Sequence, residues 1–77
     1  MTLTLARVQQ RYRIVDIRTD EESALAARLR QLGFIPGVEL TCEALAPLLK
    51  HPVLVRIRGV QVALSLSEAR LVGVEEA

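Results

Sequence analysis

Few side chains in this sequence could do chemistry. The chain has one cysteine, Cys42, and one histidine, His51. Alternating hydrophobicity predicts that Cys42 faces the interior from a strand, whereas His51 falls in the loop that follows. A nucleophilic thiol needs a base within hydrogen-bonding reach, and a free buried cysteine is usually inert. The sequence therefore favours a structural thiol and a protein that is not an enzyme.

Metal ligands are also scarce. Sites for Fe(II) commonly combine two histidines with a carboxylate, and this chain offers a single imidazole. Glu39 and Glu43 share a face of one predicted strand, but their Cα atoms would lie about 13 Å apart, too far to hold one ion. We predict no metal or other cofactor and keep Fe(II) binding as the lesser alternative.

Two arginines, Arg56 and Arg58, are predicted on the outer face of one strand, where they could contact phosphates. However, the net charge is only +1, from ten basic and nine acidic residues that are interspersed. Only Tyr12 and Phe34 are aromatic, so bases would find almost no stacking surface. A solvated strand face paired with acidic neighbours is favoured over nucleic-acid binding.

The size and composition of the chain point to a partner. Seventy-seven residues form one small domain, and 51% of them are hydrophobic, so the core must be mainly aliphatic. One cysteine and one histidine cannot supply the disulfides or metal that often reinforce such small domains. No apolar run approaches the roughly 18 residues of a membrane span or forms a signal segment, and the unpaired cysteine fits the cytoplasm.

One helix is predicted after a first strand at Tyr12 to Arg18, which has an irregularity at Asp16. Thr19 and Glu22 have the spacing of a capping box at its start, and Leu25, Leu29 and Leu32 form its apolar stripe. Gly33 is placed to end the helix at positive φ, with Phe34 packing back on Leu29 as in a Schellman motif.

The remaining pattern is that of short strands and turns. Pro36 and Gly37 predict a type II turn over 35–38, and Gly59 marks a tight turn in a hairpin. The predicted order is a strand at 38–44, a loop at 46–52, strands at 53–58 and 61–66, one helical turn at 67–70 capped by Ser67, and a last strand at 71–74. Residues 2–8 are read as an edge strand or a lead-in segment. A small, mainly β five-stranded antiparallel barrel with one α-helix between its first and second strands would leave the fewest open edges.

The motifs of this sequence resemble those of the FeoA family. They are "LRQLGFIPGVELTCEALAP", the later "HPVLVRIRGVQVALSLSEARLVGVE" and the acidic start of the predicted helix, which precedes the first of these runs. The resemblance implies a single SH3-like domain over 1–77 that is a cytosolic, non-enzymatic accessory protein for ferrous iron uptake. It implies a partner, the cytosolic GTP-binding part of the FeoB membrane transporter, with the protein peripheral at the inner membrane through that partner. Similar barrels occur in iron-dependent repressors, but the start at Met1 without a DNA-binding helix pair favours the stand-alone form.

Two surfaces are candidates for partner binding. Leu48 and Leu49 are adjacent leucines in a proline-bounded loop beside Lys50 and His51, so the loop either contacts a protein or folds back to plug one end of the barrel. The end of the helix, at Phe34 and Ile35, is the second surface. A small-barrel nucleic-acid-binding or iron-responsive regulatory module is the alternative function, and weak homo-oligomerisation is left open.

Overall fold

The computed structural model describes residues 1–18, 23–45 and 52–77. It begins with a short 3-10 helix, η1 (Leu3–Leu5), where the sequence had suggested an edge strand or a lead-in segment. The other elements are β1 (Arg11–Ile17), α1 (Ala24–Gln31), β2 (Glu39–Leu45), β3 (Val53–Ile57), β4 (Val60–Leu64), α2 (Leu66–Leu71) and β5 (Val72–Glu76).

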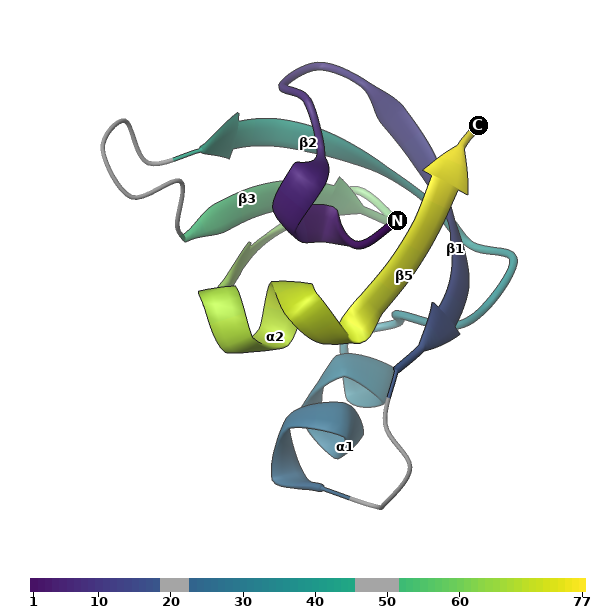
Figure 1. Ribbon diagram of the computed structural model, residues 1–77, viewed down its shortest axis with the longest axis vertical. Helices are drawn as coiled ribbons and strands as arrows, with labels where there is room; N and C mark the ends of the chain where they lie inside the picture. The colour runs from purple at the N-terminus through teal and green to yellow at the C-terminus, as the bar shows by residue number, and fades with distance from the viewer. Residues whose placement is uncertain (19–22, 46–51) are drawn as a thin grey trace.

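The five strands form one antiparallel sheet in the order β4-β3-β2-β1-β5. The sheet curls, with α2 and η1 lying across its open side and α1 at one end (Figure 1). The predicted mainly β, five-stranded antiparallel fold is confirmed, with α1 between β1 and β2 as expected. In the described part of the chain no ladder joins β4 to β5, and α2 links these two edge strands.

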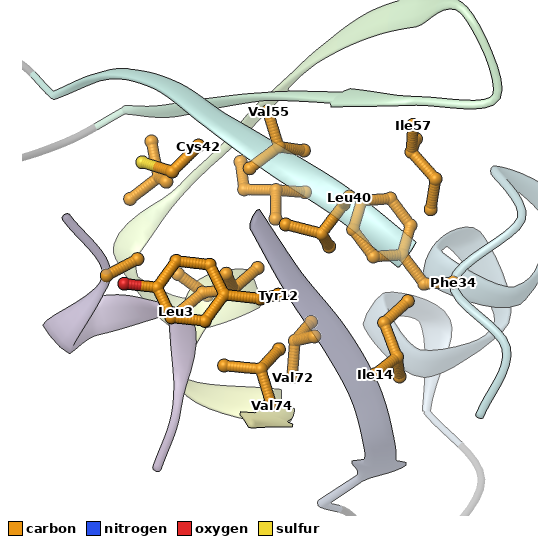
Figure 2. Packing of buried hydrophobic residues seen from close by; sticks show 14 of the residues in the cluster. Leu3, Tyr12, Ile14, Phe34, Leu40, Cys42, Val55, Ile57, Val72 and Val74 are labelled. Carbon is orange, nitrogen blue, oxygen red and sulfur yellow. The ribbon is translucent and has the colours of Figure 1, made fainter. Parts of the chain in front are cut away.

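The core inside the curl is aliphatic apart from Cys42 and two fully buried aromatic side chains, Tyr12 and Phe34 (Figure 2). Tyr12 satisfies its hydroxyl by accepting a hydrogen bond from the Arg7 backbone N–H at 2.8 Å. This hydrogen bond stabilises the fold, because a buried hydroxyl without a partner would cost the free energy of its lost hydration. Cys42 is buried and free, as predicted.

The end of α1 is the predicted Schellman motif. The Phe34 N–H donates to the Leu29 carbonyl and the Gly33 N–H to the Arg30 carbonyl, each at 3.0 Å. Gly33 has a φ of 99°, which a residue with a Cβ adopts only at a cost. The chain then turns through Ile35 to Val38, closed by a hydrogen bond from the Val38 N–H to the Ile35 carbonyl, with Gly37 at a φ of 94°. The predicted type II turn is confirmed.

The hairpin between β3 and β4 turns on two residues, Arg58 and Gly59, which both have positive φ. This is the geometry of a type I′ turn. The tight turn predicted at Gly59 is confirmed. The prediction that Arg58 lies on the outer face of a strand was wrong, because Arg58 lies in the turn. A two-residue loop needs a second left-handed residue, and Arg58 supplies it.

The start of α1 was also misplaced. Thr19 and Glu22 lie outside the described residues, and the helix begins after Ser23, whose backbone is extended and whose hydroxyl accepts a hydrogen bond from the Ala26 N–H. Leu25 was assigned to the buried stripe but is 39% exposed. The short helix buries Ala26 and Leu29 and packs Leu32 against the core, so Leu25 falls outside the buried face.

The second helix begins two residues earlier than predicted. Ser65, and not Ser67, is its N-cap, because Glu68 stands three residues after Ser65 and completes a capping box with it. Leu66, which had been assigned to a strand, is therefore the first residue of α2. The final strand accordingly starts at Val72 and runs to Glu76.

We expect Gly33→Ala to lower the free energy of unfolding by about 1 kcal/mol, because alanine is strained at this φ. Space is not the main obstacle, since the nearest atom to a new Cβ would be the flexible Arg58 side chain at 3.4 Å. Denaturant unfolding measures the change. Gln31→Ala, at an exposed position of α1, is the control and should have a much smaller effect. Equal stability of Gly33→Ala and the parent would contradict the assignment.

Candidate functional site

A pocket of about 370 Å³ lies where the helix joins the barrel. It is lined by residues from the end of β1, the last turn of α1 and the turn that follows α1. These are Asp16, Ile17, Arg30, Phe34, Ile35 and Pro36. Four of the six are apolar, with one acidic and one basic side chain among them, so the pocket suits an apolar group that has polar neighbours.

The end of β1 reaches this pocket because the strand contains a bulge. Ile14 pairs with Val74 and Asp16 with Gly73, which leaves Val15 as the extra residue. Without the bulge, the inward alternation of Tyr12 and Ile14 would continue to Asp16 and bury its carboxylate. The bulge instead leaves Asp16 exposed and returns Ile17 to the apolar side. This confirms the irregularity predicted at Asp16.

The opposite wall is the turn after α1, which is attached to β1. The Gly37 N–H donates to the Ile14 carbonyl at 2.8 Å, and the Ile14 N–H donates to the Val38 carbonyl at 2.9 Å. Ile35 is 46% exposed at the edge of the pocket, whereas Phe34 is fully buried. The Schellman motif directs the Phe34 side chain into the core, although it still lines the pocket, and its predicted contact with a partner stays a prediction.

One ion pair, between α1 and α2, fixes the position of the pocket wall that α1 forms. Arg28 of α1 bonds to the carboxylate of Glu68 of α2, and that carboxylate also accepts a hydrogen bond from the Ser65 N–H. Glu68 is the one buried charged side chain among the described residues. Because α2 packs on the barrel, this pair fixes α1, and with it Arg30, relative to β1.

Burial by itself would raise the pKa of the Glu68 carboxyl, because desolvation disfavours the charged form. The hydrogen bonds from Ser65 and the neighbouring Arg28 guanidinium outweigh this effect, so the pKa lies below its ordinary value. The group is therefore ionised at neutral pH, and the ion pair stabilises the fold there.

The remaining candidates for chemistry are separated. Burial raises the pKa of the Cys42 thiol, which disfavours the reactive thiolate. Glu39 lies 3.7 Å from Arg13, while Glu43 bonds to Arg56 at 2.9 Å, so the two carboxylates have different partners. Among residues 1–18, 23–45 and 52–77, no three histidine, cysteine or carboxylate groups gather as a metal site would require.

The two arginines, Arg56 and Arg58, do not share one face of β3. Arg56 is paired with Glu43, which also accepts a hydrogen bond from Gln61 at 3.2 Å, and this confirms the predicted pairing with acidic neighbours. The Arg56 hydrogen bond, together with the one from Gln61, lowers the pKa of Glu43 in spite of desolvation. Arg58 lies at the hairpin turn near Gly33.

The predicted loop contact at Leu48, Leu49, Lys50 and His51 lies outside the described residues. None of the helices in the described part of the chain has the length and hydrophobicity that a membrane span requires. Of the predicted partner-binding residues that the structure describes, Ile35 alone has an exposed side chain.

Four pocket residues were not proposed for partner binding from the sequence: Asp16, Ile17, Arg30 and Pro36, of which Pro36 was predicted only as part of the turn. A signal was present for Asp16, because a charged residue at an inward position of a strand indicates a bulge and a carboxylate turned outward. Arg30 gave no such signal, since an arginine near a helix C-terminus is ordinary.

The comparisons with known proteins point to one family. The family model described as FeoA domain matches residues 1–76. The structure of FeoA from Stenotrophomonas maltophilia, described as a zinc complex of an SH3 domain protein that possibly acts as a ferrous iron transport activating factor, is 33% identical, with a TM-score of 0.85. The alignment covers 97% of this chain and 89% of that one. No curated protein gave a match.

Two further structures are similar. Iron(II) transport protein A from Clostridium thermocellum is 28% identical, with a TM-score of 0.90, and the alignment covers all of this chain but 46% of that one. The zinc-bound ScaR is 18% identical with a TM-score of 0.83, covering 100% of this chain and 37% of that one, and it supports the fold alone.

We expect Glu68→Gln to lower the free energy of unfolding at pH 7 by about 1.5 kcal/mol, the low end for a charged hydrogen bond, since Arg28 is half exposed. The folded-state pKa of Glu68 is depressed, so its contribution is present above the ordinary glutamate pKa of about 4.3 and is lost as pH falls through the folded value. The difference between parent and variant should therefore shrink in acid.

Denaturant unfolding across this pH range measures the effect. Glu75→Gln is the control, because Glu75 forms an exposed pair with Arg13 and should contribute little. A difference between Glu68→Gln and the parent that stays constant from neutral pH into acid would contradict the role of this ion pair.

Proposed function

The chain belongs to the FeoA family, and on that premise we propose that it docks on the cytosolic GTP-binding part of the FeoB ferrous-iron transporter and modulates it. Its role is that of a ferrous iron transport accessory protein. In this proposal the iron is the transporter's cargo and not a resident cofactor of this chain. The protein then works in the cytoplasm, at the inner membrane through its partner.

The observation that carries the proposal is the pocket beside Ile35. An exposed isoleucine next to an apolar pocket offers a place where a partner's side chain can be buried. Its walls are set by backbone hydrogen bonds to Ile14 and by the Glu68 ion pair, so little ordering remains to be done on binding. Rigid apolar pockets of this kind are typical positions of the few contacts that dominate binding free energy.

The charges around the pocket define the partner further. Asp16 and Arg30 bring opposite charges to one pocket. A partner segment with an apolar side chain and an acidic group on the Arg30 side would be complementary, whereas the Asp16 carboxylate already lies 3.8 Å from the Arg18 guanidinium. Screening of these exposed charges by salt should weaken the association only modestly, because the apolar contact carries most of it.

A binding role also fits the chemistry of the described residues. Cys42 is buried with a raised pKa, and Arg56 is neutralised by Glu43. The side chains available at the surface pocket are those of a docking site. We propose the loop residues Leu48, Leu49, Lys50 and His51 as a second contact with the same partner.

We expect Ile35→Asp to weaken binding to the purified cytosolic GTP-binding part of the transporter by about tenfold or more, as for loss of a central apolar contact. Titration calorimetry with and without nucleotide measures the affinity. Val8→Asp is the matched control, because Val8 is 47% exposed, like Ile35, but precedes the other end of β1. If both variants bind as the parent does, the pocket is not the docking site.

The loop contact is tested separately with Leu48→Asp combined with Leu49→Asp. We expect this variant to keep its unfolding temperature, because the sequence predicts both leucines in a proline-bounded loop, and to lose affinity for the same domain. Unchanged affinity in a folded variant would remove the loop from the interface and leave the proposal for Ile35 standing. Failure of the parent chain to bind at concentrations of tens of micromolar would overturn the proposed function itself.

A further inference from the structure

The two edges of the sheet are protected to different degrees. At β5, Thr2 forms a bridge with Gly73, and the Val74 N–H donates to the Met1 carbonyl at 2.7 Å. The exposed end of β5 carries two acidic residues, Glu75 and Glu76. Pairing and charge are two of the means by which proteins prevent a sheet edge from joining another.

The other edge, β4, has none of these protections among the described residues. Its sequence, VQVAL, contains no charge and no proline, and its ladder with β3 runs without a bulge from Val53↔Leu64 to Ile57↔Val60. In a two-residue hairpin the closing pair exchanges hydrogen bonds, so Val60, Val62 and Leu64 direct their backbone groups to β3. Gln61 and Ala63 direct theirs outward, and no described group bonds to them.

We propose that the β4 edge pairs with the β4 edge of a second copy of this chain, antiparallel, about a twofold axis at Val62. In this register Gln61 stands opposite Ala63 of the second copy, and the converse holds by symmetry. Both residues have free backbone groups, so the two pairs make four hydrogen bonds and use every outward donor and acceptor of these positions.

The side chains favour a second copy as the occupant. On the outer face, Gln61 would cross the small Ala63 of the second copy, and no like charges meet. The nearest acid, Glu43, is already bonded to Arg56 and Gln61. On the other face, Val60, which is 59% exposed, would stand opposite Leu64 of the second copy and lose apolar surface to water.

The pocket beside Ile35 takes no residue from β3 or β4. Pairing through β4 therefore leaves one pocket in each copy for a partner. The interface is small, so association should be weak and concentration-dependent.

Sedimentation equilibrium of the parent chain from about 10 µM to about 1 mM should show a monomer–dimer equilibrium. Ala63→Pro removes the outward N–H that faces solvent in the monomer, a position where an edge strand tolerates proline. By symmetry it removes two hydrogen bonds and should weaken the dimer about tenfold or more. Ala63→Val, which keeps the N–H, is the matched control and should still dimerise. A parent that is monomeric throughout, or an Ala63→Pro variant that dimerises like the parent, would overturn the proposal.

Disulfide formation tests the register and does not depend on how well the proline variant folds. Two Val62→Cys residues would face each other at the axis with Cα atoms about 4.5 to 5.5 Å apart, which suits a disulfide. Two Val60→Cys residues would be offset by about 13 Å along the strand. We expect mild oxidation to crosslink Val62→Cys and not the more exposed Val60→Cys, with the parent, whose Cys42 is buried, as the blank. Equal crosslinking of both variants, or faster crosslinking of Val60→Cys, would overturn the register.

Discussion

The arrangement of both helices depends on the carboxylate of Glu68. One of its oxygens accepts the Ser65 N–H and starts α2, while the other bonds to Arg28 and holds α1. Since α2 is the connection between the two edge strands, its position also decides where β5 begins. An acidic group buried in this way is tolerated because each oxygen has a donor, and hydrogen bonds to a charged group are roughly twice as strong as neutral ones. The orientation of α1, and so the shape of the pocket, follows from this one side chain.

The pocket combines two backbone irregularities with this ion pair. The bulge at Val15 turns Asp16 outward, and the turn at Pro36 and Gly37 brings Ile35 beside it. Both features are irregular, yet both are attached to Ile14, whose side chain is in the core. Val15 follows Ile14 in the chain, and the turn is hydrogen-bonded to the Ile14 backbone through Gly37. A pocket built on such points keeps its shape, because moving its walls would require breaking the sheet.

Much of this fold could be predicted from short stretches of sequence, whereas the features that distant segments form together could not. Gly33 with Phe34 and Pro36 with Gly37 specify their conformations within five residues, so the helix end and the turn could be read directly. The start of α2 was misplaced although a local signal was present, because Glu68 stands three residues after Ser65, as a capping box requires, whereas Arg70 stands three residues after Ser67. The sequence also showed a barrel, but the pocket was missed because its lining comes from three segments that only the tertiary fold brings together.

The place of β1 in the sheet has a consequence for how the chain is made. β1 pairs with β2 on one side and with β5, the last strand, on the other. During synthesis β1 therefore leaves the ribosome with one edge that no earlier segment can cover. Roughly sixty residues separate the end of β1 from the end of β5, which corresponds to about 3 to 12 s at ordinary translation rates. Until β5 is made, the β1 edge that it covers in the folded protein has no partner, so slower translation lengthens the time in which this segment can pair with another chain.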